Sequence, residues 1–164
     1  AEHKLAGETA LAASNISTVS LRYFNVFGPK QDPSSPYSGV ISLFIKWATA
    51  EQSAKMYGDG LQTRDFVFVD DVVQANLLAA QFARIKQTSE VINIATGHDI
   101  TICDLWRNLC EICDLKADDI EFMPAREGDI RESVADISRA QLLLNYRANT
   151  DLRTGLLKCL EALA

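Results

Sequence analysis

Short strand-like segments alternate with longer helical segments along the whole chain, and this alternation constrains the fold more than any other feature. β-Branched and aromatic residues predict strands over 17–23, 55–57, 64–69, 91–94 and 120–122. Apolar residues at helical intervals predict helices over 2–14, 40–50, 70–85, 101–113, 138–144 and 151–163. The pattern is typical of a mixed α/β protein. The strands are too few and too scattered for a complete doubly wound domain, so we expect part of a larger protein.

A stretch rich in Gly, Pro, Ser and Asn covers residues 25–39 between a strand and a helix. This composition predicts a long loop, and long ordered loops in compact domains are usually functional. By contrast, Asp70 and Asp71 open a predicted helix, where free N–H groups favour negative charge, so we assign them a structural role.

Composition narrows the classes of function. Apolar residues make up 48% of the chain, enough for a hydrophobic core. The net charge of −6 argues against nucleic-acid binding, which needs a basic face. No apolar run is long enough to cross a bilayer and nothing resembles a signal peptide, so we expect a soluble cytoplasmic protein. Cys110 and Cys113 have half of a zinc-site spacing, but Cys113 lies on an apolar helix face and no second Cys pair or nearby His completes a tetrahedral set. We therefore expect core thiols and no metal site.

Two arginines on separate segments form a candidate anion site in this acidic chain. Arg64 begins a predicted strand, and Arg126 lies in a polar, Gly-containing loop. The planar guanidinium fork matches phosphate oxygens, which favours a small anionic ligand such as a diphosphate. The alternative is a pair of surface ion pairs, Arg64 with Asp65 and Arg126 with Glu127, of little energetic value. For Asp129 the structural alternative is pairing with Arg126 or Arg131.

Several segments, in order, resemble the nucleotide-sugar epimerases and dehydratases of the extended short-chain dehydrogenase/reductase family. They are residues 4–8 (KLAGE), 21–29 (LRYFNVFGP), 57–71 (YGDGLQTRDFVFVDD) and 126–129 (REGD) with Ser133, Ala135 and Asp136. The resemblance covers essentially all of residues 1–164. It implies an α/β fold that comprises the last Rossmann strands and helices plus the small substrate-binding domain. No G-x-G-x-x-G loop follows any strand, so the phosphates of NAD would be held by an upstream region.

The resemblance also assigns roles near the start of the chain. Lys4 would contact the nicotinamide ribose and assist a catalytic tyrosine four residues earlier, which lies outside these 164 residues. We therefore expect the chain alone to be inactive. The Tyr23 backbone would meet the nicotinamide carboxamide, and Phe24 and Asn25 would face the substrate. From the residues alone, the favoured interpretation is that Tyr23 and Phe24 are core aromatics and Asn25 is a turn former.

For the nucleotide, the resemblance implies that Arg64 and Arg126 contact the diphosphate. Asp129, with Arg126, would face the ribose or phosphate edge of the nucleotide. Gly39, Val40 and Tyr57 would line the base pocket, although simple packing explains Val40 and Tyr57 about as well. The implied function is NAD-dependent 4-epimerisation of a UDP-hexose by a homodimer joined through the helix that carries Ala6, Ala10 and Ala13. The alternatives are a 4,6-dehydratase, reductase or decarboxylase on the same scaffold, or a non-catalytic binding module.

Overall fold

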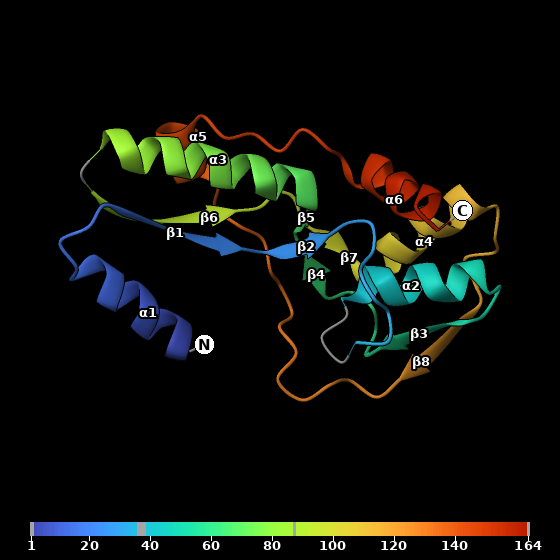
Figure 1. The fold of residues 1–164 in the computed structure, drawn as a ribbon. Helices are drawn as coiled ribbons and strands as arrows, with labels where there is room; N and C mark the ends of the chain where they lie inside the picture. Colours follow the sequence, from blue (N-terminus) through green and yellow to red (C-terminus); the bar gives the residue numbers. More distant parts are fainter. Residues whose placement is uncertain (1, 36–38, 87, 164) are drawn as a thin grey trace.

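The computed structural model describes residues 2–35, 39–86 and 88–163, and it confirms an α/β fold of parallel strand pairs and helices (Figure 1). The helices are α1 (Glu2–Ala12), α2 (Val40–Thr49), α3 (Val69–Ile85), α4 (Ile102–Cys113), α5 (Ser138–Leu144) and α6 (Leu152–Glu161). The strands are β1 (Thr18–Tyr23), β2 (Asn25–Phe27), β3 (Ala54–Tyr57), β4 (Thr63–Arg64), β5 (Phe66–Phe68), β6 (Ser89–Ile94), β7 (Ile100–Thr101) and β8 (Ile120–Met123).

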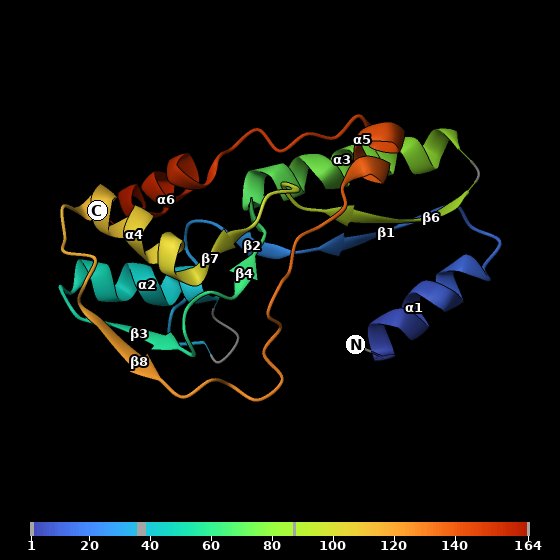
Figure 2. The ribbon, with the colours of Figure 1, turned by 180° about the vertical axis from the view of Figure 1, so that it is seen from behind.

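One half of the molecule is a three-layer arrangement around a parallel strand pair. β1 pairs with β6 from Thr18↔Ser89 to Tyr23↔Ile94. α3 and α5 cover one face of this pair and α1 lies on the other, as the two opposite views show (Figures 1 and 2). The buried side chains between these layers include Val67, Ile92, Ile94 and Tyr146. This half has the form of the last strands and helices of a Rossmann sheet.

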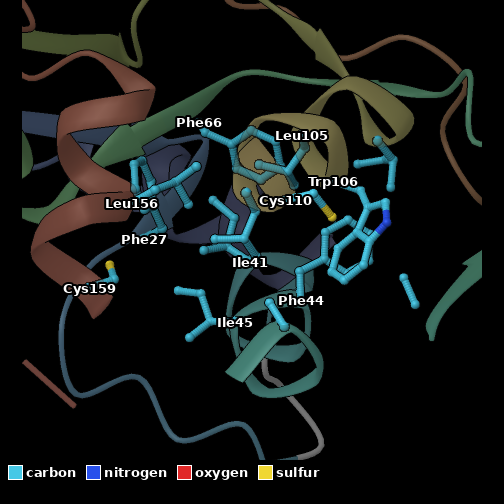
Figure 3. Close-up of a cluster of buried hydrophobic side chains, with 14 of the residues drawn as sticks. Phe27, Ile41, Phe44, Ile45, Phe66, Leu105, Trp106, Cys110, Leu156 and Cys159 are labelled. Atoms are coloured by element: carbon cyan, nitrogen blue, oxygen red, sulfur yellow. The ribbon is translucent and has the colours of Figure 1, made fainter. Parts of the chain in front are cut away.

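The other half is built from α2, α4 and α6 with the parallel pair β3–β8 on its outer side. Its core is aromatic and is shown in Figure 3. Phe44 and Trp106 meet edge to face with ring centroids 5.2 Å apart. Gly155 of α6 lies against this core, and an added Cβ there would come 2.6 Å from Cζ of Phe27. The close packing of α6 against β2 therefore requires a glycine.

Two short strand pairs join the halves: β2 with β5, parallel, and β4 with β7, antiparallel. The segment that links β8 to α5, residues 124–137, crosses from one half back to the other in an extended course (Figure 2). We call it the return segment. Its position brings residues near 126–135 beside β4.

The structure corrects two details of the expected elements and adds to a third. Residues 25–39 are not all loop, because β2 occupies Asn25–Phe27. The strand expected over 64–69 is broken at Asp65 into β4 and β5, since each half pairs with a different partner. Asp70 and Asp71 lie in the first turn of α3, as expected. Asp71 has a second role, because its buried carboxylate accepts hydrogen bonds from the backbone N–H groups of Asn149 and Thr150.

The four cysteines are free thiols, and three of them are buried. Burial raises the pKa of Cys110 and of Cys159 to about 11, so both stay protonated near neutral pH. Within the described ranges, no three His, Cys, Asp or Glu side chains gather as a possible metal ligand set. In the same part of the chain, no helix has the length and apolarity needed to cross a membrane.

Candidate nucleotide-sugar site

A cleft of about 310 Å³ lies between α2, β3 and the return segment. It gathers residues from five separated parts of the chain. Its lining includes seven of the predicted site residues: Asn25, Gly39, Val40, Tyr57, Arg64, Arg126 and Asp129. The remaining lining residues are Val26, Phe27, Gln31, Ile41, Leu43, Trp47, Lys55, Gln62, Phe66 and Ile102. We call it the α2–β3 cleft.

One wall of the cleft is the face of α2 that carries Val40, Leu43 and Trp47. These residues recur at intervals of three and four, so they form one stripe along the helix. The other side of α2 buries Ile41, Phe44, Ile45 and Ala48 in the core, as the sequence predicted. α2 is therefore apolar on both sides, and Val40, Ile41 and Trp47 both line the cleft and pack in or against the core.

The opposite wall is β3, whose side chains alternate between core and cleft. Ala54 and Met56 are fully buried, whereas Lys55 and Tyr57 line the cleft. The N–H groups of Ala54 and Gly58 donate to the carbonyls of Asp119, just before β8, and Met123, its last residue. The backbone groups of Lys55 and Tyr57 therefore point away from β8. That edge of β3 has no partner strand among the described residues. The Tyr57 carbonyl accepts a hydrogen bond from Gln62 Nε2, at 2.9 Å.

Arg126 lies over the ring of Tyr57, with its guanidinium carbon 3.8 Å from the ring centroid. This cation–π contact places a positive charge at the cleft from a segment that is otherwise exposed. Arg126 therefore does not form the surface ion pair with Glu127 that was the structural alternative.

Arg64 lies at the inner end of the cleft, where two backbone carbonyls and one carboxylate hold its guanidinium. Its Nη1 donates to the carbonyls of Thr63, at 2.7 Å, and Ile130, at 2.6 Å. Its Nη2 forms an ion pair with Asp129. The Arg64 side chain is only 17% exposed and pairs with Asp129, so the alternative of a surface ion pair with Asp65 is wrong. The alternative that Asp129 pairs with Arg126 or Arg131 is wrong for the same reason, and Arg131 pairs with Asp59 instead.

Asn25 completes the inner end, where β1 ends and β2 begins. Its backbone N–H and its Nδ2 both donate to the carbonyl of Asp65, at 3.1 and 3.2 Å. The Asn25 amide oxygen has no hydrogen-bond partner among the described residues. At the outer rim Arg131 contacts Asp59 at 2.6 Å, and this hydrogen-bonded arginine lowers the pKa of the Asp59 carboxyl.

A family model described as the NAD dependent epimerase/dehydratase family matches residues 1–95, more than half of the chain. The chain belongs to this family. It is 37% identical over 141 residues to a putative UDP-glucose 4-epimerase of Methanocaldococcus jannaschii, covering 86% of this chain and 44% of that protein. It is 31% identical over 145 residues to UDP-glucuronic acid decarboxylase 2 of Arabidopsis thaliana, covering 87% of this chain and 31% of that one.

Solved structures of epimerases show the same arrangement. The UDP-glucose 4-epimerase of Thermotoga maritima, crystallised with UDP-glucose, superposes with a TM-score of 0.87 at 34% identity. The match covers 99% of this chain and 50% of that one. The chain thus spans half or less of the length of these epimerases, and it has the α/β fold of the extended short-chain dehydrogenase/reductases.

Three residues predicted from the family lie outside the cleft. Lys4 is exposed on α1, and the described residues give it no hydrogen bond or ion pair. Tyr23 ends β1; the residue is 46% exposed, and its hydroxyl donates to Asn76 Oδ1 at 2.9 Å. Phe24 is half-buried where β1 passes into β2, and it does not line the cleft.

These positions fit one end of NAD, the cofactor of the epimerase/dehydratase family. The Phe24 N–H donates to Ile94 of β6, so the Tyr23 N–H and carbonyl face the open edge of β1, where a carboxamide could be met. No strand-to-helix turn in residues 1–164 carries the glycine pattern that holds a dinucleotide diphosphate. The residues present therefore fit the nicotinamide end of the cofactor and not its phosphates.

Sequence reasoning missed several cleft residues. Leu43 and Trp47 follow Val40 at helical spacing, and Lys55 precedes Tyr57 by two positions on a strand. Helical and strand periodicity could have found these three once Val40 and Tyr57 were chosen. Gln31 and Gln62 carry no such signal, because each lies in irregular structure.

Proposed function

We propose that the full-length protein is an NAD-dependent 4-epimerase of UDP-hexoses, and that residues 1–164 are its C-terminal, mostly substrate-binding part. The observation that carries the proposal is the convergence of Arg64, Arg126 and Asn25 on one cleft. The cleft volume of about 310 Å³ is at the lower end of the range for small-molecule sites. The NAD-binding region and the catalytic tyrosine belong to the upstream part of the protein. Four free cysteines favour the cytoplasm.

The cleft suits a nucleoside diphosphate in one orientation. The unpaired edge of β3 offers the Tyr57 N–H as donor and the Lys55 carbonyl as acceptor, a pair that matches the adjacent C=O and N–H of a uracil ring. The stripe of Val40, Leu43 and Trp47 supplies an apolar face for the base. Arg126 and Arg64 follow toward the inner end, where they bind the diphosphate. Asn25 then faces the sugar.

In the proposed reaction the bound NAD supplies the hydride acceptor and donor at C4 of the sugar. The residues of this chain bind and orient the substrate. Lys4 binds the nicotinamide ribose, and its positive charge stabilises the phenolate of the upstream tyrosine, which takes the proton from the C4 hydroxyl. The diphosphate is held by two arginines, whereas Asn25 alone is assigned to the sugar. Because the diphosphate is bound tightly and the sugar loosely, the keto sugar can rotate in the site and present its other face to the hydride.

The test is interconversion of UDP-glucose and UDP-galactose by the full-length protein with NAD. We expect turnover by the full-length protein and none by the 164-residue chain, which lacks the tyrosine and the dinucleotide phosphate site. The decarboxylase alternative is favoured by the Arabidopsis thaliana relative, and it predicts CO₂ release from UDP-glucuronate without hexose interconversion. Binding of UDP without any turnover would favour a non-catalytic module.

We also propose a homodimer through α1. No residue of α1 is buried in the described structure, although Leu5 and Leu11 are large and apolar, with exposures of 58% and 40%. Ala6 and Ala10 form a small-residue surface that lets two helices approach closely. We expect the full-length protein to sediment as a dimer at micromolar concentration, and Ala10→Arg to shift it toward monomer. A monomeric wild-type protein under these conditions would contradict the proposal.

A further inference from the structure

Asp65 is a fully buried carboxylate at the break between β4 and β5. Its oxygens accept four hydrogen bonds from two distant segments. Thr96 gives its backbone N–H at 2.9 Å and its hydroxyl at 2.6 Å, Gly97 gives its N–H at 2.9 Å, and Ala135 gives its N–H at 3.3 Å. The side chain thus joins the exit of β6 and the return segment to one point on the chain.

The backbone of Asp65 makes a second set of connections, all to the inner end of the cleft. Its carbonyl accepts both hydrogen bonds of Asn25, and Arg64 precedes it directly. Beside it, the N–H of Thr63 donates to the carbonyl of Arg131 at 2.9 Å, which aligns the return segment along β4. Asp65 therefore lies where the diphosphate-holding and sugar-facing residues are anchored to both halves of the molecule.

The chemistry of the site requires a carboxylate. Four donors converge on its two oxygens, and none of the ion pairs among the described residues includes Asp65. An ionised carboxylate is costly to bury unless such donors satisfy it. An amide in its place would turn an NH₂ group toward backbone N–H donors and leave at least one of them without an acceptor.

We infer that Asp65 is a positioning residue that fixes Arg64 and Asn25 relative to the strand ends at which the sugar reacts. This inference rests on the proposed function, because it takes Arg64 as the diphosphate holder and Asn25 as the residue facing the sugar. Asp65 touches no substrate atom. It acts by holding the β4–β5 break against residues 96–97 and 135.

The test compares Asp65→Asn with Asp71→Asn in the full-length protein. Asp71 is a matched control, since its carboxylate is also buried and also accepts two backbone N–H groups. Unlike Asp65, which lies between the cleft residues Arg64 and Phe66, it has no chain neighbour that lines the cleft. We expect both variants to lower the melting temperature. Only Asp65→Asn should weaken UDP binding, by roughly tenfold or more, which is the loss of one charge-assisted hydrogen bond. It should also lower kcat for UDP-hexose, whereas the Kd for NAD stays unchanged.

Thr96→Val provides a second variant if Asp65→Asn does not fold. It removes the 2.6 Å hydroxyl donor and keeps the shape and the carboxylate, so we expect a smaller change in the same direction for UDP Kd and kcat. Unchanged UDP affinity and kcat in both Asp65→Asn and Thr96→Val would overturn the inference. In contrast, a wild-type protein that neither binds UDP nor converts UDP-hexoses would overturn the proposed function itself.

Discussion

Replacement of Arg64 by alanine in the full-length protein is expected to raise the Kd for UDP by about one to two decades, the equivalent of roughly 1.5–3 kcal/mol. The guanidinium lies at the inner end of the cleft with its side chain mostly buried. Under the proposed function, its removal deletes charge-assisted hydrogen bonds to the diphosphate, and it also releases Asp129. Arg126→Ala should cause a loss of similar size. Calorimetric titration of UDP into each variant measures the effect.

The loss of UDP affinity should also affect KM and kcat differently. The diphosphate is bound alike in the ground and transition states, so the change should appear chiefly in KM and much less in kcat. Arg84→Ala is the control, because Arg84 is exposed in the last turn of α3, away from the cleft, and should change neither. NAD affinity should hold in all three variants. If Arg64→Ala and Arg126→Ala both bind UDP as tightly as wild type, the proposal that these two arginines bind the diphosphate is wrong.

The largest expected effect on stability is at Trp106. This side chain is 2% exposed, and its loss would leave a cavity beside Phe44, so Trp106→Ala should lower the free energy of unfolding by about 3–5 kcal/mol. Trp106→Phe is the informative comparison. The indole N–H has no hydrogen-bond partner among the described residues, so phenylalanine keeps most of the packing and removes an unpaired donor.

Urea unfolding of the full-length protein separates these outcomes. We expect Trp106→Phe to lose clearly less stability than Trp106→Ala, because a buried unpaired donor itself costs about 1–3 kcal/mol. A loss below about 1 kcal/mol for Trp106→Ala would show that the site is not part of a close-packed core.

The helices of this fold were predictable because their side-chain period is set by their own backbone. α2 and α4 each bury apolar residues that recur at helical spacing, which is the signal that predicted them. The short strands were not predictable in the same way. β2 has three residues and β4 and β7 have two each, and they are strands only because partners far along the chain pair with them. The break at Asp65 follows from the same long-range pairing.

The residues of the candidate site differ in the same way in how far the sequence could predict them. Arg64, Arg126 and Tyr57 were chosen from residue chemistry and family resemblance, and the fold brings them to one cleft. Asp65 gave no sign of its role, because an aspartate beside an arginine suggests an ion pair. Its true partners lie 31, 32 and 70 residues away. Only the folded chain brings such contacts together.

Because Arg64 forms an ion pair with Asp129, the Asp129 carboxylate competes with any anionic ligand for the Arg64 guanidinium. Asp129 is tethered within reach of the guanidinium, so it acts at a high effective concentration, and an incoming anion must displace it or share the arginine with it. A small monoanion such as chloride or acetate brings a single charge and no other contacts, so Asp129 disfavours its binding to Arg64. Under the proposed function, a nucleoside diphosphate brings two phosphates and a base that contacts other parts of the cleft. We therefore expect the ion pair to favour, at Arg64, a ligand that binds at several points over simple anions.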